Sequence, residues 1–400
     1  MENPNINFSC KDFASPKKEI SITEIIKAIG PSFVIISAVF GNVLVILSVI
    51  LYRKIRTLNH NLFVLSLAMA DVLVALFVMP FNLTQIVTNG FWPFGSLMCE
   101  IYNSNDVFLS TASIIHLCCI SMDRHFAIIH PLTYDSIMTK TRVGLMLLGC
   151  WTSSILISYI PIYSGLYTTN ENLNLLRFCS EICNFKVNHI YAIVSSSVSF
   201  WIPCVVMLLV YLRIYKEAIK HERDIYKMEK AFRRKSNRFI INTQNSNYSK
   251  NNFDSTGSPG CESDRSLIQS QNNCVRQGQK LRREHKAAKT LGIIMGCFII
   301  CWFPFFLWYS ITNLCGEEMC PYPGLLIDVL FWIGYANSAL NPLIYAFYNR
   351  EFRNAFRQIL KCQKKLLIRK NYGLVFKNNS FSDEKTSIPA KRCRSKITYA

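Results

Sequence analysis

Charged residues are scarce in this chain of 400 residues, because Asp, Glu, Lys and Arg together make up only 17% of it. Half of the residues are hydrophobic and 13% are aromatic, which is unusual for a soluble domain. Acidic residues are the rarer charge: 25 Asp and Glu stand against 44 Lys and Arg, giving a net charge of +19. The composition argues against an ordinary soluble domain and indicates a membrane protein with basic polar segments.

Several other features are missing. Residues 1–20 lack the apolar core of a cleavable signal peptide, since Lys17, Lys18 and Glu19 interrupt it. No metal cluster, phosphate loop or nucleophile with base and orienting group is spaced as in enzymes, so no enzyme is expected. No internal repeat supports a transporter built from paired halves, and no groove-reading motif makes nucleic acid a partner.

Long apolar segments are abundant. A helix of about 20 residues crosses about 30 Å of hydrocarbon, and windows of that kind predict seven spans in an all-α membrane bundle. They lie at residues 31–52, 61–86, 99–129, 143–165, 187–215, 287–313 and 323–347.

Basic residues predict the orientation of these spans. The segments 52–60, 124–142, 213–290 and 350–400 hold 38 of the 44 Lys and Arg. By the positive-inside rule they are cytoplasmic, so we expect an extracellular N-terminus and a cytoplasmic C-terminus. The basic charge also makes anionic membrane lipid an expected partner.

The polar segments divide the chain further. We expect an extracellular tail at 1–30 and a membrane core at 31–349, interrupted at about 217–285 by a cytoplasmic loop too polar to stay ordered. A short amphipathic helix is expected at 350–362, followed by a cytoplasmic tail at 363–400.

The amphipathic prediction rests on the spacing of Phe352, Phe356 and Ile359, which share one helix face beside three arginines. We expect this face to lie along the bilayer. Cys362 follows the helix and is a candidate palmitoylation site, although a free thiol is the alternative.

Sixteen cysteines include six in the segments expected outside, where disulfides form. We expect Cys99, at the start of the third span, to pair with Cys183, and Cys315 to pair with Cys320. A zinc site at the latter pair is disfavoured because no histidine or second cysteine pair stands near it. Cys10 and Cys179 either pair or stay free.

Asp106 lies within the third span. A carboxylate there costs about 2.5–3.5 kcal/mol on insertion scales, so it indicates a partner cation or a wet cavity. We infer a positively charged ligand. Asp71, in the second span, is a second carboxylate of this kind.

Short motifs occur in each span. In chain order they are Asn42, Asp71, Asp123-Arg124-His125, Trp151, Pro203, Cys301-Trp302-Phe303-Pro304 and Asn341-Pro342-Leu343-Ile344-Tyr345. This set resembles the rhodopsin-like G-protein-coupled receptors across the whole membrane core. The resemblance implies a bundle of seven helices and a heterotrimeric G protein, receptor kinases and arrestin as partners. An ion channel or transporter is the alternative from another class.

Finer resemblance points to the biogenic-amine branch. It implies that Asp106 binds the ammonium of a small amine agonist and that Tyr335 supports this carboxylate. Ser195 and Ser199 share a helix face and are expected to bond a phenol, with Ser196 supporting them. The resemblance gives the remaining ligand-binding residues as Val107, Ser110, Phe185, Trp302, Phe305, Phe306, Tyr309 and Phe331.

Three longer runs are similar to the invertebrate beta-adrenergic-like octopamine receptors: residues 108–121, 163–169 and 331–335. The resemblance implies octopamine as agonist and a stimulatory G protein that raises cyclic AMP. Tyramine, dopamine and adrenergic-like amines remain alternatives. Phe331 argues against adrenaline, because adrenergic receptors usually carry an asparagine there for the ligand's side-chain hydroxyl.

The resemblance also assigns the signalling switch. It implies that Arg124 pairs with Asp123 and with Glu284 in the resting state, although Glu284 is otherwise simply a solvated charge. Tyr211, Asn341, Pro342 and Tyr345 complete the switch. His125 replaces the usual tyrosine and can titrate near neutral pH.

Asp71 with Ser113, Asn337, Ser338 and Asn341 resembles the family's sodium-binding network. An allosteric sodium ion is therefore expected as the only candidate cofactor, and a water-filled network is the alternative.

A first prediction concerns Asn7 in the acceptor sequence Asn7-Phe8-Ser9. Asn82 has the same pattern but lies too near the membrane, and Asn247 and Asn378 are expected inside. We predict a glycan on Asn7, so glycosidase should increase the electrophoretic mobility of the wild type but not of Asn7→Gln. A mobility shift that survives this substitution contradicts the assignment.

Overall fold

The structure of the protein is a computed structural model that describes Cys10 and most of residues 22–361. Its described residues are 10, 22–130, 132–217, 219–220, 223, 226–227, 230, 234, 290, 292–316, 319–321 and 323–361. Asn7, Glu284, Cys362 and most of the predicted cytoplasmic loop lie outside them. Within the described part the regular elements are all helices.

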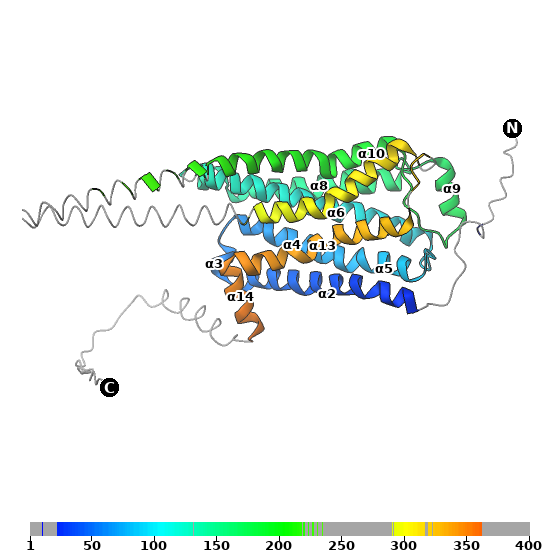
Figure 1. The fold of residues 1–400 in the computed structure, drawn as a ribbon, viewed down its shortest axis with the longest axis horizontal. Helices are drawn as coiled ribbons and strands as arrows, with labels where there is room; N and C mark the ends of the chain where they lie inside the picture. The colour runs from blue at the N-terminus through cyan, green and yellow to red at the C-terminus, as the bar shows by residue number, and fades with distance from the viewer. Residues whose placement is uncertain are drawn as a thin grey trace, which may run out of the picture.

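Long helices lie side by side along the longest axis of the molecule (Figure 1). They are α2 (Ile22–Leu51), α4 (His60–Phe77) with α5 (Met79–Val87), α6 (Gly95–Ile129), α8 (Lys140–Tyr163), the helix His189–Glu217, the helix Gly292–Cys315, and α13 (Gly324–Tyr348). The helix His189–Glu217 begins with α10 (His189–Ser196) and η1 (Ser197–Trp201). The described residues thus supply one helix for each of the seven predicted spans.

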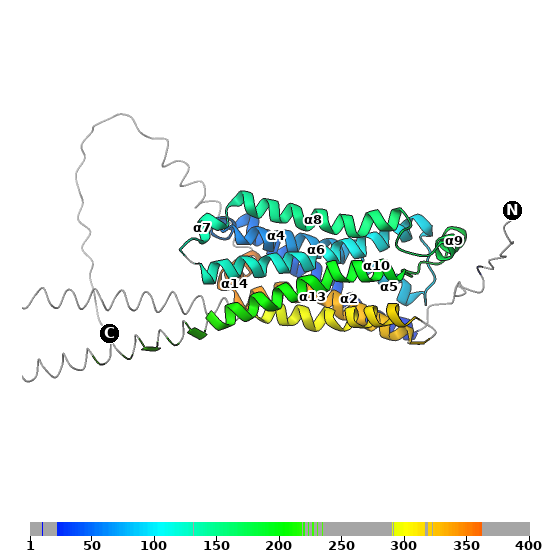
Figure 2. The ribbon, with the colours of Figure 1, turned by 90° about the horizontal axis from the view of Figure 1, so that it is seen from above.

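Shorter helices mark the two ends of this bundle. α3 (Arg53–Arg56), α7 (Tyr134–Ile137) and α14 (Arg350–Leu360) lie at one end, and α9 (Asn170–Phe178) lies at the other (Figures 1 and 2). We call these the α14 end and the α9 end.

Six helices of the described part are long and apolar enough to cross a membrane. The six do not include α13, although it has 25 residues, because Asp328, Asn337 and Asn341 dilute its apolar character. The first helix begins at Ile22, earlier than the predicted residue 31. The prediction stopped short because Glu24 and Lys27 are charged, but Glu24 is buried and accepts a hydrogen bond from Asn89.

Prolines interrupt two of the long helices. Pro80 lacks the N–H that would bond the Leu76 carbonyl, and the second span accordingly breaks at Val78 between α4 and α5. Pro203 likewise cannot bond the Ser199 carbonyl. The preceding η1 is a π turn, in which the Ile202 N–H bonds the Ser197 carbonyl.

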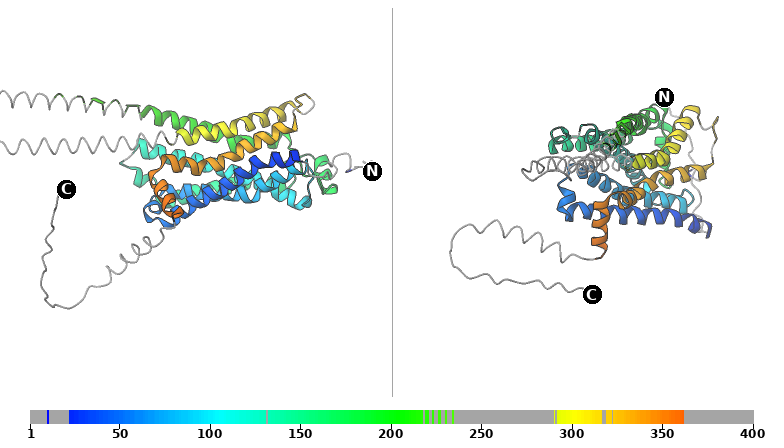
Figure 3. Two further views of the ribbon diagram at one scale, coloured as in Figure 1. Left: turned by 60° about the horizontal axis from the view of Figure 1, so that its bottom comes forward. Right: turned by 60° about the vertical axis from the view of Figure 1, so that its left-hand side comes forward.

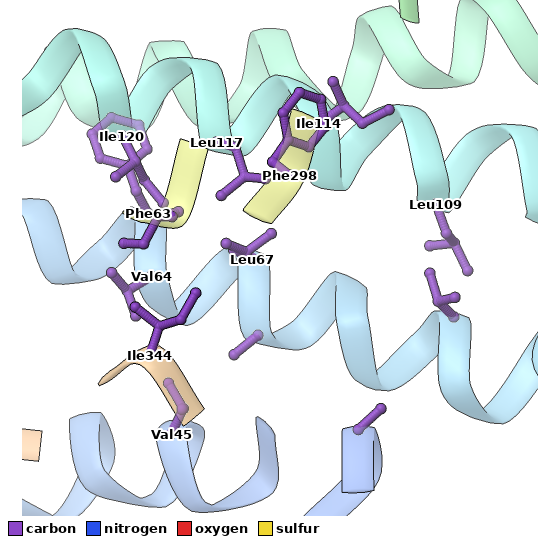
Figure 4. Close-up of a cluster of buried hydrophobic side chains, with 14 of the residues drawn as sticks. Val45, Phe63, Val64, Leu67, Leu109, Ile114, Leu117, Ile120, Phe298 and Ile344 are labelled. Atoms are coloured by element: carbon purple, nitrogen blue, oxygen red, sulfur yellow. The ribbon is translucent and has the colours of Figure 1, made fainter. Parts of the chain in front are cut away.

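The core of the bundle is a continuous apolar cluster to which five of its helices contribute labelled side chains (Figure 4). These side chains are Val45, Phe63, Val64, Leu67, Leu109, Ile114, Leu117, Ile120, Phe298 and Ile344. Two glycines allow α13 to pack closely. A Cβ on Gly41 would lie 2.8 Å from the Pro342 ring, and one on Gly334 would lie 2.9 Å from the Trp302 ring. Side chains at these positions would push α13 away from its neighbours.

Three disulfides lie at the α9 end: Cys99–Cys183, Cys315–Cys320 and Cys10–Cys179. The first two are the predicted pairs, and the third resolves the pairing that the sequence left open. The Cys10–Cys179 bond packs in a small apolar cluster with Leu175, Leu176 and Ile182.

The predicted amphipathic helix is present as α14, which turns away from α13 (Figure 3). The Asn349 side chain caps it by accepting the backbone N–H groups of Glu351 and Phe352. Its position along the bilayer stays a prediction. Phe352 and Phe356 are buried, and the Phe352 ring stacks on Tyr345 at 5.4 Å. Phe352 and Phe356 therefore pack against the bundle, next to Tyr345 of α13.

Candidate functional site

A cavity of about 610 Å³ opens among the helices and is closed in part by α9 and the segment after Cys183. Most of the predicted ligand-binding residues line it: Asp106, Val107, Ser110, Phe185, Ser195, Ser199, Trp302, Phe305, Phe306, Tyr309 and Phe331. Helices distant in sequence therefore bring these side chains to one place. Ser196 and Tyr335 are not among the lining residues.

Asp106 projects from α6 into this cavity. Its Oδ1 atom accepts a hydrogen bond from the Tyr335 hydroxyl at 3.0 Å and another from the Ser110 hydroxyl at 3.4 Å. Tyr335 is only 1% exposed, so it supports the carboxylate from behind the cavity wall. An anion held in this way in surroundings poor in water attracts a cation more strongly than it would in bulk solvent.

Hydroxyl groups from α10 and η1 line one part of the cavity. Ser199 lies 2.8 Å from the Thr111 hydroxyl, and Ser195 lies 3.4 Å from the Tyr309 hydroxyl. Ser196 differs from the prediction: its hydroxyl donates to the Ile193 carbonyl at 3.3 Å, within its own helix. Ser196 is only 4% exposed and is not among the residues that line the cavity.

Aromatic rings form a connected wall from the bottom of the cavity to α13. Trp302 contacts both Phe305 and Phe306, and Phe305 contacts Phe331 with ring centroids 4.9 Å apart. Phe306 also stacks on Phe200 at 4.5 Å. The cavity thus combines an apolar aromatic wall with the carboxylate of Asp106.

Asp71 lies deeper in the bundle and is fully buried. Its carboxylate accepts the Ser113 hydroxyl at 3.2 Å, the Ser338 hydroxyl at 2.8 Å and the Asn341 amide at 2.9 Å. Asn337 is buried nearby in sequence but is not one of these donors. In the described part of the chain, no group of three or more His, Cys, Asp or Glu side chains forms a metal cluster.

A third buried carboxylate, Asp123, lies toward the α14 end. Arg124 donates from Nε at 2.9 Å and forms an ion pair with it, and the Tyr134 hydroxyl donates at 2.7 Å. Burial and this hydrogen bond raise the pKa of Tyr134 above its usual value. Glu284, the other predicted partner of Arg124, lies outside the described residues.

The predicted switch residue Tyr211 also packs closely in this region. A Cβ on Gly292 would lie 2.6 Å from the Tyr211 hydroxyl, so glycine allows the two helices to meet. Pro342 fits against Gly41 and Tyr345 against Phe352.

Several polar residues of these sites were not predicted from the sequence, among them Tyr102, Asn82 and Tyr134. Tyr102 and Asn82 line the cavity, and Tyr134 bonds Asp123. Helical spacing could have indicated Tyr102, which precedes Asp106 by one turn. No local pattern indicates Tyr134, because it comes from a short helix after the third span.

The comparisons with known proteins decide the family. Residues 41–345 match the family described as 7 transmembrane receptor (rhodopsin family). The chain belongs to this family. It is thus a receptor and a membrane protein, and its family is not a family of enzymes.

Proteins similar to this receptor include octopamine receptors and, at 36–38% identity, 5-hydroxytryptamine receptor 4 and the D(1A) and D(1) dopamine receptors. The receptor is 50% identical to octopamine receptor beta-1R of Drosophila melanogaster over 82% of its own chain and 60% of that protein. It is 46% identical to Drosophila octopamine receptor beta-2R over 86% and 62% of the two chains, respectively. For octopamine receptor beta-2R of Chilo suppressalis the identity is 47% over 82% and 78%. The receptor thus spans about three fifths of the length of the two Drosophila proteins.

A second prediction concerns Tyr134→Phe, which removes the hydrogen bond to Asp123 and weakens the restraint on Arg124. A hydrogen bond to a charged group is worth about 1.5–3 kcal/mol, so the resting population should fall and signalling without agonist should rise by about tenfold or more. Second-messenger output at matched surface expression measures the effect. Ser136→Ala, which removes an exposed hydroxyl on the same short helix, is the control. Equal basal output from Tyr134→Phe and the wild type would contradict the conclusion that Tyr134 helps to restrain Arg124.

Proposed function

We propose that this receptor binds octopamine, couples to the stimulatory G protein and raises cyclic AMP. The observation that carries the proposal is the placement of Asp106 in an aromatic cavity that also holds Ser195 and Ser199. Its resemblance to proteins named as octopamine receptors supports the choice among amines. Tyramine, dopamine and adrenergic-like amines are the competing agonists.

The chemistry of the cavity suits the two ends of a phenolic amine. The ammonium would form a charge-assisted hydrogen bond with Asp106, which Tyr335 holds in place. The phenol hydroxyl would exchange hydrogen bonds with Ser195 and Ser199 at the other end. The wall formed by Phe305, Phe306 and Phe331 would stack against the ring between them.

Signalling requires that the agonist bind one state of the receptor more tightly than the other. Contraction of the cavity around the amine would draw Ser195 and Ser199 toward Asp106 and press on Trp302. Because Trp302 packs against Gly334 of α13, this pressure reaches the helix that carries Asn341 and Tyr345. Release of Arg124 at the α14 end would then open a groove for the G protein.

We place the receptor in the plasma membrane with the α9 end outside and the α14 end inside. The support is the excess of Lys and Arg in the segments joined at the α14 end. In this orientation receptor kinases and arrestin would meet the α14 end, and anionic lipid would lie beside its basic segments.

We further propose an allosteric sodium site at Asp71. Oxygen atoms suit a hard cation, and the Asp71 carboxylate and the hydroxyls of Ser113 and Ser338 supply them. A sodium ion there should favour the resting state, so replacing sodium with choline should raise agonist affinity in the wild type. Asp71→Asn should remove this dependence, and a sodium effect unchanged by the substitution contradicts the site.

The test of the main proposal is a panel of amines applied to cells that report cyclic AMP. Octopamine should give the lowest half-maximal concentration, with tyramine, dopamine and adrenaline weaker. A response to another amine at lower concentration would reassign the agonist. A fall in cyclic AMP would reassign the G protein.

The same cells test Asp106 directly. Asp106→Ala should reduce amine affinity by at least about thirtyfold at unchanged surface expression, because truncating one partner of a buried charge pair costs about 2–5 kcal/mol. Asp328→Ala removes another carboxylate that lines the cavity and should change affinity by less than about tenfold. Undiminished affinity in Asp106→Ala would end the amine assignment.

A further inference from the structure

Phe185 borders the ligand cavity from a segment that has no regular secondary structure. Residues 182–188 form neither helix nor strand, and Phe185 is among the residues that line the cavity. The Cys99–Cys183 bond holds the backbone two residues before Phe185, but it does not orient the phenyl ring. A side chain of a binding site needs packing partners that fix its rotamer. The contacts of the Phe185 ring therefore determine how it meets a ligand.

Two tyrosines make these contacts. The Tyr167 ring stacks on Phe185 with centroids 5.5 Å apart and planes 13° apart. The Tyr191 ring meets Phe185 at 6.4 Å with planes 83° apart, and Tyr167 meets Tyr191 at 6.3 Å. Each ring thus contacts the other two, in the stacked and edge-to-face arrangements that aromatic pairs prefer. We call Tyr167, Phe185 and Tyr191 the aromatic triad.

Tyr167 is the member of the aromatic triad that lies behind the cavity wall. It is only 1% exposed and is not among the residues that line the cavity, whereas Phe185 and Tyr191 are. Together with Ile162 it forms an apolar cluster separate from the main core, against which Val187 packs. Tyr167 therefore acts on a ligand through the rings in front of it.

Asn188 joins the chain that carries Tyr167 to the helix that carries Tyr191. Its backbone N–H donates to the Tyr167 carbonyl at 2.8 Å, and its side-chain amide donates to the Leu166 carbonyl at 2.7 Å. Its Oδ1 atom accepts the backbone N–H of Tyr191 at 2.8 Å and so caps α10. The Tyr191 hydroxyl donates to the Ile157 carbonyl of α8 at 3.1 Å. The two tyrosines are thus fixed before any ligand arrives.

We propose that Tyr167 is a positioning residue that holds the Phe185 ring against the aromatic ring of an amine bound at Asp106. This inference rests on the proposed amine function and extends its binding site to a residue that no ligand touches. A phenyl ring that Tyr167 already holds loses little conformational freedom when the ligand binds, so its contact with the ligand contributes more to affinity.

The experiment measures octopamine affinity by competition binding on intact receptor at matched surface expression. Tyr167→Leu keeps an apolar side chain but removes the stacked ring, so affinity should fall by about three- to tenfold, as expected for the loss of one aromatic pair. Tyr167→Phe keeps the ring and should bind within about twofold of the wild type. Tyr163→Leu is the matched control, because Tyr163 stacks on Tyr159 outside the aromatic triad. It should bind as the wild type does.

A double-mutant cycle separates positioning from general damage to the fold. Phe185→Leu should lower affinity at least as much as Tyr167→Leu does. Because Tyr167 acts through Phe185, the variant with both substitutions should bind within about twofold of Phe185→Leu alone. Independent structural damage would instead multiply the two losses. If Tyr167→Leu does not reach the cell surface, Tyr167→Met, which also lacks a ring, takes its place in the cycle.

Several results would overturn the proposal. They are wild-type affinity in a Tyr167 variant without a ring, multiplied losses in the double variant, and an equal loss in Tyr163→Leu. If another aromatic amine binds more tightly than octopamine, the proposed agonist is wrong, and the same cycle with that amine decides the role of Tyr167. If no aromatic amine binds the wild type, both proposals fail.

Discussion

Asp71, Asp106 and Asp123 each accept a hydrogen bond from a residue on another helix. This requirement constrains how the helices of the bundle pack. An anion in apolar surroundings is costly without such donors. Asp71 on α4 takes hydrogen bonds from α6 and α13, Asp106 on α6 takes one from α13, and Asp123 takes one from α7. These bonds fix the register of the helices at three levels of the bundle, and close apolar packing between the levels supports that register.

Helix α13 supplies three of these hydrogen-bond donors. Phe331, Tyr335, Ser338 and Asn341 follow one another on α13 at spacings of three and four, so they share a face. The first borders the cavity, the second holds Asp106, and the last two hold Asp71. Gly334 on α13 admits the Trp302 ring, so α13 also rests against the floor of the cavity. A displacement of α13 would therefore change the hydrogen bonds of Asp106 and of Asp71 together.

Hydropathy predicted the long helices, because the length of an apolar run is a property of local sequence. The family resemblance supplied eleven of the residues that line the cavity. They did not predict where a helix ends when a charge is satisfied by a distant partner. Glu24, for example, is buried within α2 and accepts a hydrogen bond from Asn89. They also did not show that Phe352 and Phe356 are buried in the protein, because lipid and the protein interior are both apolar. The Cys10–Cys179 pairing and the contact between Tyr134 and Asp123 depend on tertiary structure, and Ser196 was misplaced by treating neighbouring hydroxyls as one group.

The Cys99–Cys183 bond has a consequence for biosynthesis. Cys183 and the three residues after it all border the cavity, and the bond ties their segment to the first turns of α6. Before oxidation, this wall is joined to the bundle only through its chain connections and non-covalent contacts. A newly made receptor therefore completes its ligand site only in a compartment that oxidises thiols. Maturation of the cavity thus depends on thiol oxidation as well as on the packing of the helices.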